Sequence, residues 1–226
     1  MSKHILFPLA LLALVSLPGT IFAQAVVRNG ASGDSAAPRY HYLFENPRFT
    51  TPVQEVEFDG AGRGRYRFQK KDQEETVLTF EVSGALLSQV QTLFDSLNFL
   101  ESNEEYQHKK DFSHLGTKAI TFSRGGRERT VKFNYTENQS LNRLADIFQN
   151  LATQETRFYE LEAVRASDPI STPAQLRLLE GELKSKHIAD PGRFEKVLQE
   201  IKLDEGVPLI ARNHAERLLQ MIRKGK

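Results

Sequence analysis

The pattern of apolar and polar positions changes its period within residues 76–100, from two to about 3.6, and this segment organises the predicted fold. Positions 76–82 alternate and are rich in β-branched and aromatic residues, which is typical of a half-buried strand. Over residues 84–97 apolar residues recur at steps of three and four, which predicts an amphipathic helix. Ser83 lies between them and is expected to cap the helix, because its hydroxyl can accept a hydrogen bond from a free amide of the first turn.

Five other alternating segments predict further strands, and turn residues join four of them into two hairpins. The loop of the first hairpin contains Gly60, Gly62 and Gly64, and that of the second contains Gly125 and Gly126. A glycine-rich loop can also cradle a phosphate, but such a loop leads into a helix. An alternating segment follows Gly64, so the hairpin is favoured. The five segments are 40–44, 53–58, 65–70, 117–123 and 128–134.

The apolar stripe of a second helix begins after Asn138 or Ser140, either of which can cap it, and continues through Leu161. This helix is therefore expected to project beyond the sheet. Residues 166–171 are the predicted boundary between two parts of the chain. Thr172 is expected to open the next helix as the first residue of a capping box, with a proline at the first helical position.

Together these periods predict an α+β fold. An α+β domain over residues 40–165 is expected to hold an antiparallel sheet of about five to six strands with two helices on one face. A small all-α C-terminal region over residues 171–226 is expected to contain three amphipathic helices, as a bundle or as a cap on the sheet domain. No internal repeat is clear enough to predict a solenoid.

The N-terminal segment, residues 1–23, has the three parts of an export signal: a positive start at Lys3, an apolar core and a region of small residues. Cleavage is expected after Ala23 or Ala25. The alternative is a retained membrane anchor, which is less favoured because the apolar run is short and contains prolines. Residues 24–39 are small and polar and predict a flexible tether. The mature protein is therefore expected in the periplasm or the medium.

The amino-acid composition of the chain disfavours several classes of function. The 226 residues contain 30 Lys and Arg, 29 Asp and Glu, and no cysteine. A nearly neutral chain disfavours a nucleic-acid partner, and a chain without cysteine has no disulfide and no thiolate nucleophile. An exported protein without disulfides fits a bacterial envelope best. No cofactor is predicted, the oligomeric state is left open, and membrane contact is expected only through an uncleaved signal segment.

Three arginines, Arg63, Arg65 and Arg67, share one face of a predicted strand and form the first candidate site. This stripe predicts an interaction surface for an envelope protein or an acidic polymer. The alternative, which is favoured on general grounds, is a solvated strand face paired with Glu55 and Glu57 across the hairpin. The export signal, the absence of catalytic signatures and the exposed charged strands make a non-catalytic binding or interaction module of the cell envelope the leading function.

The second candidate site is the charged loop at residues 104–114, where His108, Asp111 and His114 are metal-type ligands close together in sequence. Their spacing matches no recognised metal motif, so a solvated loop is favoured. The alternative function is a metal-dependent or hydrolytic enzyme that uses this loop. The chain contains neither a nucleophile elbow nor an HExxH motif, so no catalytic residue is assigned.

The order of strands, helices and loop over residues 40–152 is accompanied by several local features. These are the helix end Asn98-Phe99-Leu100, the loop residues Tyr106 and Asp111, and the turn Gly125-Gly126. With these features the chain resembles a family of small exported bacterial domains of unknown function. The resemblance implies an exported module of sheet and helices, and it carries over no catalytic residue.

Overall fold

A computed structural model describes residues 37–225 of the chain. The predicted export signal, residues 1–23, and the predicted tether as far as residue 36 lie outside the described residues. Among residues 37–225, no helix combines the length and apolar character needed to cross a membrane.

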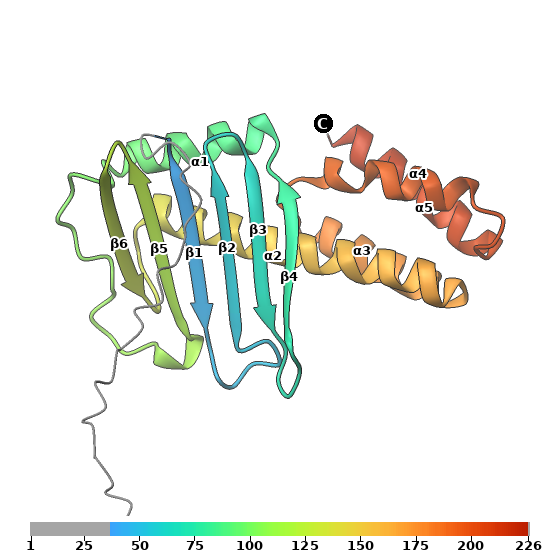
Figure 1. Ribbon diagram of the computed structural model, residues 1–226, viewed down its shortest axis with the longest axis horizontal. Helices are drawn as coiled ribbons and strands as arrows, with labels where there is room; N and C mark the ends of the chain where they lie inside the picture. Colours follow the sequence, from blue (N-terminus) through green and yellow to red (C-terminus); the bar gives the residue numbers. More distant parts are fainter. Residues whose placement is uncertain (1–36, 226) are drawn as a thin grey trace, which may run out of the picture. The chain divides into compact units, whose positions relative to one another are not determined.

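Six strands form one antiparallel sheet in the order β4-β3-β2-β1-β5-β6 (Figure 1). The first four strands make a meander, and β1 pairs with β2 on one side and with β5 on the other. The turn between β2 and β3 is the hairpin expected at the glycine-rich loop. The strands are β1 (Arg39–Glu45), β2 (Val53–Asp59), β3 (Arg63–Gln69), β4 (Glu75–Glu81), β5 (Thr117–Arg124) and β6 (Arg127–Phe133).

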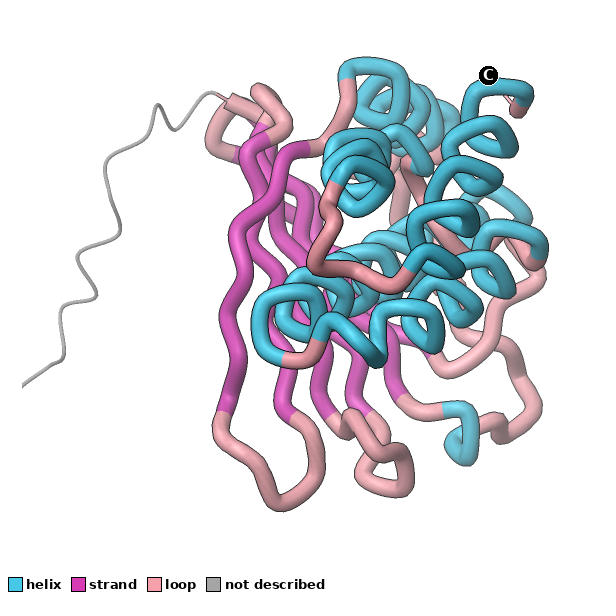
Figure 2. Tube along the Cα trace, turned by 90° about the vertical axis from the view of Figure 1, so that its right-hand side faces the viewer, coloured by secondary structure: helices cyan, strands magenta, loops and turns pink. Residues whose placement is uncertain are grey.

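Two helices, α1 (Gly84–Ser96) and α2 (Gln139–Ser167), cover one face of this sheet. Figure 2 shows the helices on one side of the sheet and the other side uncovered. Phe94 of α1 stacks on Phe122 of β5 at 4.6 Å between ring centroids. Phe148 of α2 stacks on Tyr42 of β1 at 5.3 Å. The predicted α+β fold with two helices on one face is confirmed.

Two of the helix caps that the sequence predicts are present in the structure, and a third is not. The side chains of Ser83 and Asn138 accept hydrogen bonds from backbone amides of α1 and α2, as expected. The prediction that Thr172 is the first residue of a capping box is wrong. A short 3-10 turn (Pro169–Ser171) precedes α3 (Thr172–Lys184), so Thr172 already has a helical backbone and its buried hydroxyl has no hydrogen-bond partner.

The C-terminal region is helical, as predicted, and has an apolar core separate from the core beneath the sheet. The helix α2 joins the two, because Phe148 belongs to the core of the sheet and Leu161 to the C-terminal core. The remaining elements of this region are a 3-10 turn (Pro191–Phe194), α4 (Glu195–Leu203) and α5 (Leu209–Lys224).

Candidate functional site on the open sheet face

The sheet face that α1 and α2 leave uncovered carries the first candidate site. Because side chains alternate along a strand, Arg63, Arg65 and Arg67 of β3 lie on this face, while Tyr66 and Phe68 are buried on the other. The face assignment made from the sequence is therefore correct.

Each of the three arginines is paired with a carboxylate. A guanidinium nitrogen of Arg65 lies 2.8 Å from a carboxylate oxygen of Glu57 on β2. Arg67 donates to Glu55 of β2, whose carboxylate also lies 2.7 Å from Nε2 of His41 on β1. Arg63 is likewise bound to Asp59, and Arg67 also to Glu75, at 2.8 and 2.7 Å. The stripe thus has the cross-hairpin pairing that the sequence left open as the alternative.

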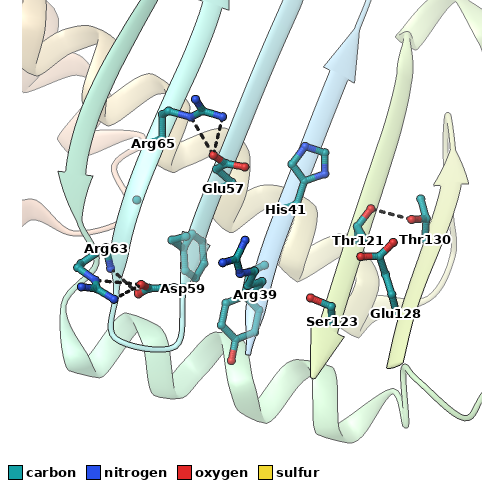
Figure 3. A pocket seen from close by; sticks show the side chains of 13 residues that line it. Arg39, His41, Glu57, Asp59, Arg63, Arg65, Thr121, Ser123, Glu128 and Thr130 are labelled. Carbon is teal, nitrogen blue, oxygen red and sulfur yellow. Dashed lines mark hydrogen bonds and ion pairs between the residues drawn. The ribbon is translucent and has the colours of Figure 1, made fainter. Parts of the chain in front are cut away.

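A hollow of about 620 Å³ lies on this face above β1 (Figure 3). The paired Arg63 and Arg65 border it on the β3 side. On the β5 and β6 side it is bordered by hydroxyls, and those of Thr121 and Thr130 are hydrogen-bonded to each other at 2.8 Å. The hollow therefore has charged groups on one side and mainly hydroxyl groups on the other.

Arg39 lies within this hollow, on β1, opposite Asp59 of β2 and Ser123 of β5. Within residues 37–225, no hydrogen bond or ion pair joins its guanidinium to another group. A free guanidinium offers five N–H donors in a planar fork that fits a carboxylate or phosphate. Among the cations that line the hollow, Arg39 is therefore the one available to an anionic ligand without breaking a pair within residues 37–225.

Sequence reasoning missed Arg39 because it was assigned to the end of the tether. The signal was present: Arg39, His41 and Leu43 alternate with buried aromatic residues of β1, which extends the strand by one residue toward the N-terminus. The candidate site therefore includes a residue from the first position of the first strand.

The ion pairs of the open face shift the ionisation of Glu55. Burial alone would raise the pKa of this carboxyl, but hydrogen bonds from His41 and Arg67 outweigh burial and lower the pKa from its ordinary value. A carboxyl whose pKa is lower in the folded than in the unfolded protein stabilises the fold above the unfolded pKa, which is about 4.3. This contribution is lost as the pH falls through the folded pKa.

We expect Glu55→Gln to lower the free energy of unfolding by about 1–3 kcal/mol at neutral pH, because it removes the charged acceptor shared by His41 and Arg67. The difference from wild type should shrink as the pH falls below the unfolded pKa and through the folded pKa, where the wild-type carboxyl itself becomes protonated. Urea unfolding at a series of pH values measures this. Glu57→Gln is the control, because its more exposed pair with Arg65 is worth only about 0–1 kcal/mol. A Glu55→Gln difference that is independent of pH would contradict the assignment.

The second candidate site lies on the loop between α1 and β5, which includes a 3-10 turn (Ser113–Leu115). His108 lies 3.3 Å from a carboxylate oxygen of Glu137 and packs edge-on against Phe112. Asp111 accepts a hydrogen bond from the amide of Ser113 at 2.7 Å, and His114 is exposed. Within residues 37–225, no group of three or more His, Cys, Asp or Glu side chains is placed to hold a metal ion. The structure does not bring the three candidate ligands together.

Arg129 of β6 fastens the beginning of this loop to the sheet. Its guanidinium donates to the backbone oxygens of Phe99 and Glu104 at 2.8 and 2.7 Å. It also lies 5.6 Å from the ring centroid of Tyr106, which is buried. The loop is therefore held by specific contacts, which the absence of a period in its sequence did not indicate.

The chain matches no protein-family model and no curated protein. The resemblance to small exported bacterial domains therefore stays a prediction. The case for a site on the open sheet face rests on its geometry and charges alone.

Proposed function

We propose that this protein is a non-catalytic binding module exported to the cell envelope, and that its open sheet face holds an envelope protein or an acidic polymer. The observation that carries the proposal is Arg39, a cation inside the hollow of the open face that has no partner among residues 37–225. The export part is supported by the pattern of residues 1–23.

The surroundings of Arg39 favour a partner with spaced acidic groups over a uniformly charged one. Asp59, Glu57 and Glu128 also border the hollow and repel an anion that is placed away from Arg39. The hydroxyl of Ser123, opposite Arg39 on β5, can donate a hydrogen bond to the same anionic group. Binding should therefore depend on position as well as on charge.

We expect the protein to bind a copolymer in which glutamates alternate with serines, a probe with spaced acidic groups, and Arg39→Ser to weaken this binding about tenfold, the loss expected for a charge-assisted contact. Because Arg39 has no partner in the part of the chain that the structure describes, the substitution should leave the free energy of unfolding within about 0.5 kcal/mol of wild type. Fluorescence anisotropy with labelled polymer, at low and at high salt, measures the affinity and its screening.

Two further variants make this test specific. Arg217→Ser removes an exposed arginine from α5, away from the sheet, and should leave the affinity unchanged. Replacing Arg63, Arg65 and Arg67 together by Ser should also weaken binding, although it breaks ion pairs. Equal affinities of wild type and Arg39→Ser for the polymer would refute the assigned site.

A further inference from the structure

The C-terminal region is built from two helical hairpins, α2 with α3 and α4 with α5, that lie side by side. Arg165 of α2 contacts Glu200 of α4 at 2.6 Å, and His214 of α5 contacts Glu180 of α3 at 2.9 Å. Arg165 is near the C-terminal end of α2, and its partners Glu200 and Asp204 are near that of α4, so the turns that follow these two helices are neighbours. Both connecting turns therefore lie at the same end of the region, away from the sheet (Figure 1).

These two turns carry the most exposed large aliphatic side chains within residues 37–225. Their exposed fractions lie between 61% and 79%, whereas the next most exposed, Leu178 on α3, has 50%. Single exposed leucines are ordinary on a protein surface, but four that gather at one end mark a contact site. We call them the turn patch: Ile170, Leu203, Leu209 and Ile210.

Acidic groups flank the turn patch. Asp168 lies two residues before Ile170 and forms no ion pair within the described residues. Glu205 lies between Leu203 and Leu209, is exposed, and likewise forms no ion pair within these residues. Asp204 lies in the same turn, where it accepts a hydrogen bond from a backbone amide and lies 3.9 Å from Nε of Arg165. Of the nearby cations, Lys202 and Arg165 are paired with Glu216 and Glu200, and Arg212 lies in the first turn of α5. The patch is therefore apolar with a predominantly acidic border.

We infer that the turn patch binds a segment of a partner protein that presents an apolar side flanked by lysine or arginine, such as a basic amphipathic helix. The acidic border attracts this partner and orients it. It also disfavours the other occupants: two copies of the patch would oppose like charges, and an anionic membrane surface would be repelled. This inference goes beyond the proposed function and concerns a different surface.

The test uses the full chain, purified as the cell produces it, and an amphipathic peptide of leucine and lysine of about 14 residues, four helical turns. We expect replacement of Leu203, Leu209 and Ile210 together by Gln to weaken peptide binding at least about tenfold, because the apolar anchors of an interface carry most of its affinity. These side chains are exposed, so the variant should remain folded. Fluorescence anisotropy of labelled peptide gives Kd.

The control Leu178→Gln removes an exposed leucine outside the patch and should leave Kd unchanged. A peptide of leucine and glutamate should bind more weakly to wild type than the lysine peptide. Equal binding of the lysine peptide by wild type and the triple variant would overturn the inference. Two other results would also overturn the inference, if the triple variant abolishes them. One is binding of wild type to phosphatidylcholine–phosphatidylglycerol vesicles, and the other is self-association of wild type in sedimentation. Arg39→Ser should leave peptide binding intact, which separates this result from that on the sheet face.

Discussion

Replacing Phe148 by Ala is expected to lower the free energy of unfolding by about 3–5 kcal/mol. The side chain is fully buried on α2, and its ring stacks on that of Tyr42 and lies 5.6 Å from that of Phe58. The substitution removes the apolar contacts of a whole ring and leaves a cavity between α2 and the sheet, which close-packed neighbours can fill only in part. Urea unfolding followed by circular dichroism measures the loss.

Tyr159→Ala is the matched control for this prediction, because Tyr159 is an aromatic residue on the same helix with 45% of its surface exposed. Both substitutions place Ala in α2, so a difference in helix propensity cannot explain a difference between them. Tyr159→Ala should change the free energy of unfolding by less than about 1 kcal/mol. Similar losses for the two variants would show that Phe148 does not hold the helix on the sheet.

The elements of the fold could be predicted because each segment repeats its apolar positions at the period of one kind of structure. The order of the strands could not. Alternation states which residues of β1 face the helices, but it does not state that β1 lies between β2 and β5. That pairing joins residues such as Tyr42 and Ile120, which are far apart in sequence, and it depends on how α1 carries the chain from one edge of the sheet toward the other.

The candidate site could be predicted in part for a related reason. The alternation of β3 places its three arginines on one face. Whether carboxylates neutralise these arginines depends on the register with β2, which sets Arg65 opposite Glu57 and Arg67 opposite Glu55. Arg39, which is unpaired among residues 37–225, acquires its surroundings only when β1 is placed inside the sheet. In the same way, no local pattern indicates that Arg129 will fasten the loop before β5.

Arg193→Met is expected to lower the free energy of unfolding by about 3–5 kcal/mol, because it leaves the carboxylate of Glu155 buried without its cation. Only 2% of the Glu155 side chain is exposed, and its oxygens lie 3.3 Å from the Arg193 guanidinium. Gln154 still donates one hydrogen bond to this carboxylate, but a neutral amide does not replace a charge. Methionine retains apolar contact with the ring of Phe158, over which Arg193 lies at 3.7 Å.

The loss of stability in Arg193→Met is expected mainly in α4 and α5, because of where the Glu155–Arg193 ion pair lies. Arg193 lies in the 3-10 turn that leads into α4, and Glu155 lies on α2, so the pair ties the second hairpin of the C-terminal region to the helix that also serves the sheet. Hydrogen exchange should therefore accelerate in α4 and α5 of Arg193→Met while the strands keep their protection. The double variant Glu155→Leu with Arg193→Met should recover most of the stability, because no buried charge remains. Uniform acceleration throughout the sheet, or a double variant less stable than Arg193→Met alone, would show that the cost arises from lost packing and not from the unpaired carboxylate.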